Sequence, residues 1–420
     1  MSPARPLAIV FVLAAVGCFS LGSESKSSSG CNTGECKKGP IPAHASGSTD
    51  PQGCVSYRCD FGWAGCGQDC NTHLVDDSAN CGACGNACTE SACKLGSCGV
   101  VRELAVGLVS PTRVATGGGY VYFVAGIDEG GSETAIFRVP RDGGASEQIA
   151  VTNAVVALEA SNAGVFWIEN GEELRGVRAG DRAVVTLASA LDGAMSLVVD
   201  DDNAAWLSRR LPESDAGTDA SDGGNNARSG GVWTMPLAAG SPSLLVAFTH
   251  DYSSSFFGQL GDPLAQSGDW LVFVDGLDNV RAVRRSSGAT VTLASKIEGA
   301  VLGVAADDSF AYWYSATLNI CLGGACSAPP PHLFRAPLGG GDVVEIPTNA
   351  LSPRAARWGE LYAIDEAGRA VVRIDMVSGA RHVIAGGLGE IEGLAVDDAS
   401  IYWIAHGASR SDGRLMSSAR

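Results

Sequence analysis

Short runs of alternating apolar and aromatic residues recur along most of the chain, beginning soon after residue 100. Each run follows a short turn and predicts a strand, because alternation with a period of two places successive side chains on opposite faces of a sheet. The runs recur about every 40 residues, with two longer intervals, and this period is typical of a four-stranded propeller blade. Seven runs can be aligned, at 119–124, 163–168, 203–208, 269–274, 310–315, 360–365 and 400–405.

Each repeating unit divides into four predicted strands around its aromatic run. A strand of small residues precedes the run, as in GLAVD (393–397), and two strands follow it, as in AIFRVPRDGG (135–144) and AVVTLAS (183–189). Small residues suit the axis, where blades converge, and aromatic residues fill the wedge that widens outward. The 55 glycines fit many tight turns between short strands.

The seventh unit has three predicted strands and then ends with GRLMSSAR (413–420). The segment VVRELAVGL (100–108), which precedes the first unit, matches the fourth-strand pattern of AVVTLASAL (183–191). We therefore expect this N-terminal strand to complete the last blade, because closure removes unpaired sheet edges. The predicted fold class is all-β: a seven-bladed β-propeller closed by an N-terminal strand and preceded by a small disulfide-rich segment.

One repeat also carries a family resemblance. The run SIYWIA (400–405), which follows AVDD (395–398), resembles the repeats of the YWTD propellers of lipoprotein receptors. It is more similar to the propeller repeats of exported myxobacterial proteins. YWTD propellers have an intact Tyr-Trp-Thr-Asp and six blades, whereas no unit here keeps the Thr-Asp pair and seven units align. The resemblance therefore implies a propeller but not a receptor function.

Eleven of the 14 cysteines lie between Cys31 and Cys98, a density that predicts a disulfide framework in an exported chain. Cys81 and Cys84 form a C-x-x-C that would also suit a zinc or redox site, but no second C-x-x-C accompanies it and the nearby histidine is His73. Disulfides are therefore favoured, with their connectivity open. The odd count leaves one cysteine free, paired elsewhere or in an intermolecular bond.

The motif NCGACGNAC (80–88) within this segment resembles the Cys-rich modules of exported myxobacterial proteins. Those modules have no established catalytic role. The resemblance therefore implies export more than chemistry.

The N-terminus predicts export directly. Arg5, an apolar stretch over 7–16 and small residues before Cys18 are typical of a signal peptide. AVGC (15–18) resembles a bacterial lipobox, which implies acylation of Cys18 after cleavage; plain secretion is the alternative. The predicted organisation is a signal peptide, a flexible tether, a disulfide-rich segment and a propeller, at 1–17, 18–30, 31–98 and 99–420. The expected location is the cell envelope, as an outer-membrane lipoprotein, or the medium.

Charge and motifs exclude several function classes. A net charge of -17 and a pI near 4.7, with no basic run, disfavour nucleic acid. Membrane contact is expected through the lipid anchor alone. The chain has no G-x-S-x-G, no H-E-x-x-H and no P-loop, so common catalytic motifs are absent from the sequence.

Loop lengths indicate where a ligand would bind. Between the second and third strands the even units have tight turns and the odd units have insertions, and these loops all emerge on one face. A long connection at 249–263 reaches the same face and contains a partly aromatic candidate ligand patch; local packing under the loop is the alternative reading. The patch residues are His250, Asp251, Tyr252, Phe256 and Phe257.

Two further features of these loops concern metals and cross-links. Asp215, Asp219 and Asp222 could supply oxygens to calcium, but a disordered linker is the favoured reading of this stretch and their spacing does not match an EF-hand. No other cofactor is expected. Cys321 and Cys326 are expected to form a small disulfide that stiffens their loop.

The paired aspartates Asp307/Asp308 and Asp397/Asp398 recur at one turn of the repeat and predict turn formation instead of chemistry.

The expected function is a non-enzymatic extracytoplasmic binding protein, a monomer, whose ligand is an extracellular protein or glycan. One alternative is a propeller hydrolase or lyase acting on extracellular carbohydrate, which predicts convergent acidic, His or Arg groups in the channel mouth. Another is a structural surface protein with the propeller as spacer.

Overall fold

The computed structural model contains strands and turns throughout the part of the chain it describes. Among these residues, no helix is long and apolar enough to span a membrane. The described residues are 38–60, 62–67, 69–89, 92–128, 133–209, 228–238, 240–250, 262–276, 278–316, 332–348, 352–357, 359–365, 369–387, 389–407 and 409–420.

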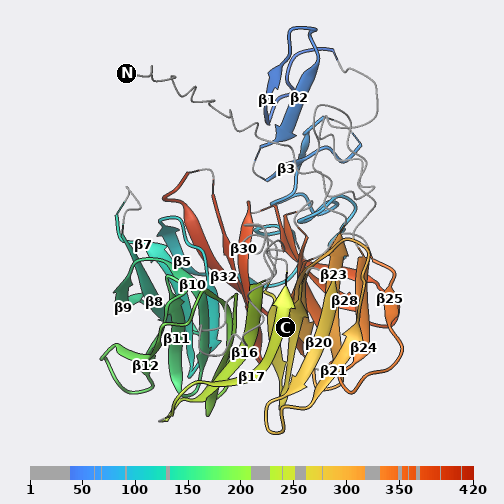
Figure 1. The fold of residues 1–420 in the computed structure, drawn as a ribbon. Coiled ribbons are helices and arrows are strands. Elements are labelled where there is room, and N and C mark those ends of the chain that lie inside the picture. Colours follow the sequence, from blue (N-terminus) through green and yellow to red (C-terminus); the bar gives the residue numbers. More distant parts are fainter. Residues whose placement is uncertain are drawn as a thin grey trace, which may run out of the picture.

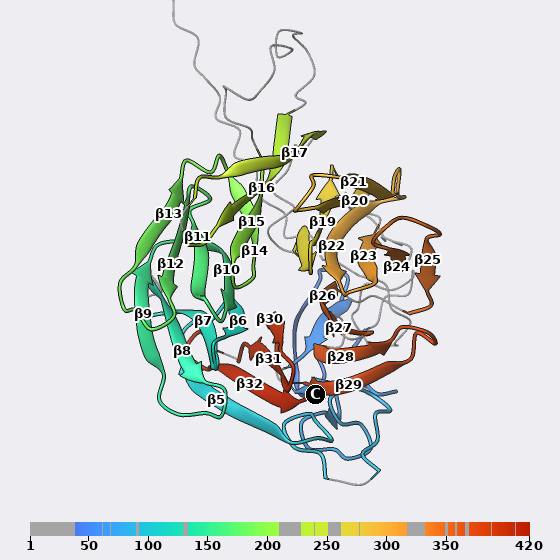
Figure 2. The ribbon, with the colours of Figure 1, turned by 90° about the horizontal axis from the view of Figure 1, so that it is seen from below.

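Seven four-stranded antiparallel sheets form a ring of blades (Figure 2). Blades 1 to 3 are β6 (Val114–Gly117), β7 (Tyr120–Gly126), β8 (Thr134–Pro140) and β9 (Glu147–Thr152); β10 (Val155–Ser161), β11 (Gly164–Glu169), β12 (Glu173–Arg178) and β13 (Val185–Ser189); and β14 (Ala194–Val199), β15 (Asn203–Ser208), β16 (Arg228–Pro236) and β17 (Ser243–His250). Blades 4 to 6 are β18 (Leu264–Ser267), β19 (Trp270–Asp275), β20 (Asn279–Arg284) and β21 (Thr290–Ala294); β22 (Ala300–Ala306), β23 (Phe310–Ala316), β24 (His332–Pro337) and β25 (Val344–Ile346); and β26 (Ser352–Arg357), β27 (Glu360–Asp365), β28 (Ala370–Asp375) and β29 (Arg381–Gly386).

Blade 7 is assembled from both ends of the propeller sequence. It contains β30 (Ile391–Val396), β31 (Ser400–Ala405), β32 (Gly413–Ala419) and then β5 (Val101–Leu108). The strand β32 pairs with β31 on one side and with β5 on the other, and Figure 2 shows β5 lying along β32. The predicted closure by an N-terminal strand is confirmed.

Large aromatic side chains lie at the centre of most blades. Each stands in the second strand, and the hydrophobic clusters that contain them join neighbouring blades, so the ring has a nearly continuous core. Burial of this apolar area is the main stabilising contribution. The equivalent residues, all at most 1% exposed, are Phe123, Trp167, Trp206, Phe273, Trp313 and Trp403, with Ala363 in blade 6.

The paired aspartates form turns, as predicted. One carboxylate oxygen of Asp307 accepts hydrogen bonds from the backbone N–H groups of Ser309 and Phe310, at 2.9 and 2.8 Å, and the other accepts the Tyr312 hydroxyl at 2.7 Å. Asp397 repeats this arrangement with Tyr402. The first aspartate therefore fixes the turn between the first two strands of its blade.

The second aspartate of such a pair joins its blade to the preceding one. Asp308 accepts a hydrogen bond from the Ser267 hydroxyl at 3.0 Å, so it links blade 5 to blade 4. In blade 3, Asp201 accepts hydrogen bonds from the backbone and side-chain amides of Asn162 in blade 2. The recurring pair thus has a structural role in both of its positions.

The disulfide-rich segment has little regular structure. Its described residues form two small hairpins, and four disulfides join pairs of cysteines among them. The hairpins are β1 (Ala45–Thr49) with β2 (Val55–Cys59), and β3 (Trp63–Ala64) with β4 (Thr72–His73). The disulfides are Cys59–Cys70, Cys66–Cys84, Cys81–Cys93 and Cys88–Cys98. Several disulfides in one short segment indicate an oxidising, extracellular environment.

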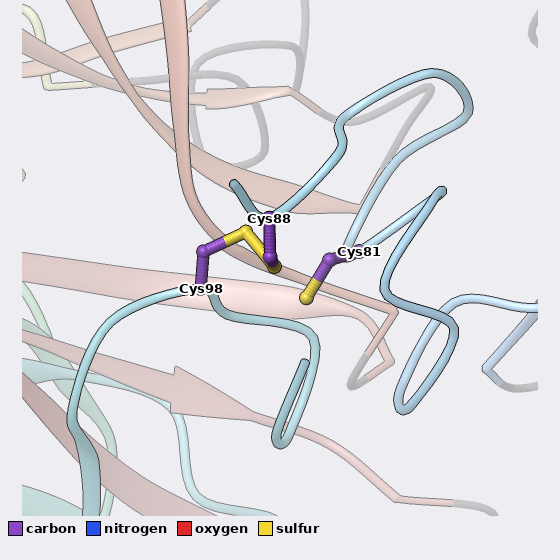
Figure 3. A group of neighbouring side chains, drawn as sticks. All are labelled: Cys81, Cys88 and Cys98. Atoms are coloured by element: carbon purple, nitrogen blue, oxygen red, sulfur yellow. A yellow bond between two sulfur atoms is a disulfide. The ribbon is translucent and has the colours of Figure 1, made fainter. Parts of the chain in front are cut away.

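The disulfide pairing shows that the C-x-x-C motif is neither a redox pair nor a zinc site. Cys81 and Cys84 are bonded to different partners and not to each other. The sulfur atoms of Cys81, Cys88 and Cys98 lie within 4.8 Å of one another, and Figure 3 shows Cys81 beside the Cys88–Cys98 disulfide. Because all three are in disulfides and a metal ligand must be a thiolate, this group is not a zinc site. Cys54 is disulfide-bonded too.

Candidate functional site

One face of the ring carries the connections between second and third strands and those that lead from one blade to the next. We call it the loop face. The second-to-third connections alternate as expected: in the even blades they run from Glu169 to Glu173, Asp275 to Asn279 and Asp365 to Ala370. In the odd blades they are longer, running from Gly126 to Thr134, Ser208 to Arg228, Ala316 to His332 and Ala405 to Gly413.

The disulfide-rich segment stands on this same face, with β1 and β2 farthest from the ring (Figure 1). It is docked through backbone contacts at the end of β29. The backbone N–H of Gly386 donates to the carbonyl of Gly96 at 2.9 Å. A Cβ added to Gly96 would lie 1.6 Å from the Gly386 carbonyl oxygen, and one added to Gly82 would lie 2.9 Å from the Gly386 nitrogen. Only glycine allows so close an approach.

The charge of one arginine in the segment also acts on an arginine of blade 6. Arg369, in the tight turn of blade 6, is close enough to Arg58 of β2 and to Glu390 for their charges to act on it. Burial, and then the like charge of Arg58, lower the pKa of Arg369.

The loop residues expected to bind ligand fall mostly outside the described residues. His250 is the last residue of β17. The rest of the aromatic patch, the calcium candidates, the loop cysteines and the acylation site all lie outside: Asp251, Tyr252, Phe256, Phe257, Asp215, Asp219, Asp222, Cys321, Cys326 and Cys18. These predictions remain untested.

The innermost strands present a feature that sequence reasoning missed. Glu159 of β10 is paired with Phe166, one position along from the pair of Leu158 with the buried Trp167. The equivalent residue is small or β-branched in every other blade, so Glu159 is a single departure from the repeat. Those equivalents are Ala115, Val198, Ala265, Ala305, Ala355 and Ala395.

Charged groups from several blades act on this carboxyl. Burial has the largest influence and raises the pKa of Glu159, and the negative charge of Asp262 raises it further. Arg357 and Arg113 oppose this change, and the pKa of Glu159 lies at about 8. Glu159 is therefore mostly protonated at neutral pH.

The groups that influence Glu159 are spread around the ring. Glu159 belongs to blade 2, whereas Arg113 precedes blade 1, Asp262 precedes blade 4 and Arg357 ends the innermost strand of blade 6. These residues thus come from four different blades, and Glu159 itself lies on the innermost strand of its blade. Glu159 as a whole is half-buried.

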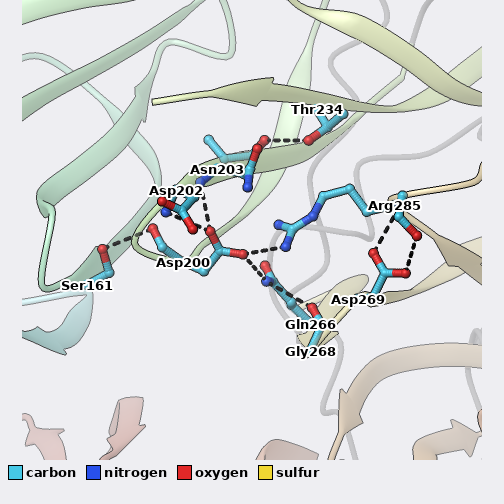
Figure 4. Close-up of polar contacts among 11 residues, drawn as sticks. Ser161, Asp200, Asp202, Asn203, Thr234, Gln266, Gly268, Asp269 and Arg285 are labelled. Atoms are coloured by element: carbon cyan, nitrogen blue, oxygen red, sulfur yellow. Dashed lines mark hydrogen bonds and ion pairs between the residues drawn. The ribbon is translucent and has the colours of Figure 1, made fainter. Parts of the chain in front are cut away.

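A second polar cluster lies on the opposite face and joins three blades (Figure 4). The carboxylate of Asp200 in blade 3 is ion-paired with Arg285 and accepts a hydrogen bond from Gln266 at 2.8 Å, both in blade 4. Its backbone carbonyl accepts the Ser161 hydroxyl from blade 2 at 3.0 Å. Although burial opposes it, hydrogen bonds from the Asp202 backbone and from Arg285 hold the pKa of Asp200 below its usual range. This cluster holds blades together.

A groove of about 200 Å³ lies between blades 6 and 7, beside the disulfide-rich segment. Arg373, Arg420 and His382 are among its lining residues. Both arginines are ion-paired with the single carboxylate of Glu360, at 3.2 and 3.0 Å, which offsets one of their two positive charges. The groove and the inner-strand carboxyl of Glu159 are therefore two separate candidate sites.

No protein-family model and no curated protein matches the sequence. Solved propeller structures do match it. An oligogalacturonate lyase in complex with manganese has a TM-score of 0.52 at 11% identity, with 77% of this chain and 93% of that chain covered. The β-propeller domain of the Trilobed protease from Pyrococcus furiosus, described as having an open velcro topology, has a TM-score of 0.52 at 13% identity, with 74% and 95% covered.

An acylaminoacyl peptidase in complex with a chloromethyl ketone has a TM-score of 0.51 at 13% identity, with 73% of this chain and 51% of that chain covered. At identities this low the matches show the fold alone. The class defined by the fold is therefore a closed seven-bladed β-propeller with a docked disulfide-rich segment. Because enzymes are among the matched propellers, the fold does not by itself decide between binding and catalysis.

Proposed function

We propose that the protein is an exported, lipid-anchored binding protein that holds an extracellular protein or glycan on its loop face. The observation that supports this most is the backbone docking of the disulfide-rich segment beside the long connections of the odd blades. A rigid ring that displays irregular loops on one face is a common arrangement for binding. The acidic chain, at -17, makes a nucleic acid an unsuitable ligand.

The test is a capture experiment with the mature chain beginning at Cys18. Residues 211–227 are replaced by a short Gly-Ser linker, and the variant is compared with wild type for retention of envelope proteins and glycans, with and without calcium. Binding through the loop face predicts loss of the retained partner. The calcium arm also tests Asp215, Asp219 and Asp222 as ligands.

A matched control lies on the opposite face. Val377 is 88% exposed in the turn between β28 and β29, so Val377→Asp changes that face without touching the core. The variant should retain the partner as wild type does. Capture that survives the loop replacement but is lost on removal of 38–98 would favour the structural reading, in which the propeller is a spacer.

The anchor needs a separate test. Metabolic labelling with palmitate should mark wild type and leave Cys18→Ala unlabelled. Equal labelling of both proteins, or of neither, would contradict acylation at Cys18 and favour plain secretion.

A second candidate function is cleavage of an extracellular glycan in the channel, which Glu159 and Asp262 favour. A glycoside hydrolase needs one protonated and one ionised carboxyl group, and a pKa of about 8 keeps Glu159 protonated at neutral pH. The check is release of reducing ends from neutral and acidic polysaccharides. Cleavage abolished by both Glu159→Gln and Asp262→Asn would replace the binding proposal with the enzymatic one.

A further inference from the structure

We propose that the Cys88–Cys98 disulfide is a modification site for a small thiol, and that the neighbouring Cys81–Cys93 disulfide takes the second step of the exchange. The small thiol stays on the protein in a mixed disulfide, Cys81 changes its partner and Cys93 becomes a thiol. The site belongs to the disulfide-rich segment and not to the connections of the odd blades. It can therefore be present or absent whatever the outcome of the loop-face experiment.

The first support is the short distance between the two disulfides. The sulfur atoms of Cys81, Cys88 and Cys98 lie within 4.8 Å of one another, and Cys81 stands beside the Cys88–Cys98 bond (Figure 3). A disulfide is about 2.05 Å long, so a sulfur released from Cys88–Cys98 reaches Cys81 by a movement of less than about 3 Å. Among the described residues, this is the one group of three cysteine sulfurs so close together.

The second support is a set of backbone hydrogen bonds that holds these cysteines in place. The backbone N–H of Cys88 donates to the Ser78 carbonyl at 2.8 Å, and that of Cys93 donates to the Ser78 hydroxyl at 3.2 Å. The backbone N–H of Cys81 donates to the Asn86 carbonyl at 2.8 Å, and the Asn86 side-chain amide donates to the Cys81 carbonyl. None of these bonds involves a sulfur atom, so a cysteine can change its disulfide partner without breaking them.

The two disulfides differ in their access to solvent. Cys81 is 0% exposed and Cys93 is 7% exposed, whereas Cys88 and Cys98 are half-buried. Exchange requires a thiolate to reach a disulfide sulfur directly. A thiol from solution therefore attacks the outer disulfide, Cys88–Cys98, and the inner disulfide reacts only with the sulfur that this attack releases.

Each step of the exchange balances in bonds and charge. The thiolate of the small thiol attacks one sulfur of Cys88–Cys98, forms a mixed disulfide with it and releases the other as a thiolate. That thiolate attacks Cys81, forms a new disulfide with it and releases Cys93 as a thiolate. Cys93 then takes up the proton that the small thiol lost on ionising. The chain has gained one small thiol, and the number of disulfide bonds has risen by the mixed disulfide while one protein disulfide has been lost.

The surroundings of Cys93 favour this end point. Its Sγ lies 3.3 Å from the carbonyl oxygen of Val75 and 3.6 Å from that of Leu74. A disulfide sulfur carries no hydrogen, whereas a Cys93 thiol can donate its S–H to these oxygens. Burial beside carbonyl oxygens also disfavours the Cys93 thiolate, which is the form that would attack in the reverse direction. The exchanged pairing should therefore persist.

The experiment is incubation of the full mature chain with an equimolar amount of reduced glutathione at about pH 8, where part of the thiol is ionised. An acid quench and alkylation of thiols at low pH then preserve the pairing. Cleavage after Glu90 and Lys94 places Cys93 alone on the peptide 91–94, which mass spectrometry identifies. We expect alkylated Cys93 together with glutathione on Cys88 or Cys98, and Cys81 bonded to the other of these two.

The chain contains a matched control disulfide, Cys66–Cys84. Cys84 is exposed, so glutathione can reach this bond too, but neither cysteine belongs to the close group of sulfurs. Reaction there should give a mixed disulfide or two thiols without any new pairing between protein cysteines.

The double variant Cys81→Ala/Cys93→Ala removes the inner disulfide and keeps the outer one. The thiolate released from Cys88–Cys98 then has no neighbouring disulfide to attack, so it returns to the mixed disulfide and expels glutathione. The variant should therefore lose the glutathione that the wild type retains. Thermal unfolding checks that the variant is folded, and equal retention by a folded variant would contradict the proposal.

The result for the wild type decides the proposal even if the double variant does not fold. The proposal is overturned if Cys88–Cys98 does not react, if modified chains keep Cys81–Cys93, or if Cys81 and Cys93 are alkylated together, as simple reduction gives. New bonds to the remaining cysteines of the segment would indicate general scrambling and would overturn it as well.

Discussion

The propeller buries a large aromatic side chain in almost every blade, whereas the described part of the disulfide-rich segment buries few large side chains and is held by disulfides. In the propeller, Trp167 and Trp403 are fully enclosed. In the segment, Val55, Tyr57 and Leu74 are the largest buried apolar residues other than cysteine. A small segment cannot bury enough apolar area to fold alone, so covalent bonds replace the core. The two regions should therefore fail under different treatments.

The largest effect is expected from removing the last strand of the ring. Deletion of 413–420 removes β32, which pairs with both β31 and β5, so it opens blade 7 and exposes two sheet edges. We expect loss of the cooperative unfolding transition in a circular dichroism melt. A chain that begins at residue 99 keeps every propeller strand and is the matched control.

That control should melt cooperatively if the ring does not need the segment. If the chain lacking 413–420 melts as the wild type does, blade 7 tolerates an open sheet. That result would contradict the closure argument.

Reduction of the disulfides should disrupt the disulfide-rich segment and leave the propeller folded. The four described bonds close loops with sequence separations of 10 to 18 residues, and each contributes about 3 kcal/mol to stability in the chain-entropy account. With a reductant, residues 38–98 should lose protection from hydrogen exchange while the propeller strands keep theirs. Loss of protection in both regions would mean that the docked segment is part of the propeller's cooperative unit.

Two tryptophans allow a side-by-side test of the same difference. Trp403 is fully buried in blade 7, and Trp63 is partly exposed in the segment, stacked on His44 with ring centroids 3.5 Å apart. Trp403→Ala should destabilise the propeller by about 3–5 kcal/mol, because a large cavity is left in a packed core. Trp63→Ala should leave the propeller transition unchanged. Denaturant unfolding of the two variants gives both values.

The same difference explains how much the sequence could predict. Blade number and ring closure follow from alternation and period, which each unit repeats, and the fourth-strand match of 100–108 is a local pattern. Cysteine pairing depends on distances between residues far apart in the chain. Cys81 and Cys84 are neighbours in sequence, yet they bond to Cys93 and Cys66, and no spacing rule gives that result.

Glu159 was missed for a different reason. The inner strands were read for the small residues that they share, and a search for common features overlooks a single exception. Aligning the position after Leu158 in all units would have shown one acidic residue among alanines and a valine. The charged residues that influence it, Arg113, Asp262 and Arg357, come from three other blades, so no local pattern in the sequence links them to it.

The smallest expected effect concerns the seam at which the ring closes. His406 follows β31, and its Nε2 lies 2.6 Å from Glu392. The hydrogen bond with Glu392 raises the pKa of His406 above its usual value, although burial opposes it. Because the folded state binds this proton more tightly than the unfolded state, the contribution to stability is present at pH values below the unfolded pKa. It is lost as pH rises through the raised folded pKa.

His406→Gln should therefore lower the melting temperature slightly at about pH 5.5 and have no effect at about pH 9. The pair is partly exposed, and solvent screens it, so the difference should stay below about 1 kcal/mol. Glu392→Gln, which removes the same pair from the other side, should reproduce this pH dependence. A destabilisation that is equal at both pH values would mean that His406 acts through packing, and that the seam, like the blade centres, depends on buried contacts instead of charge.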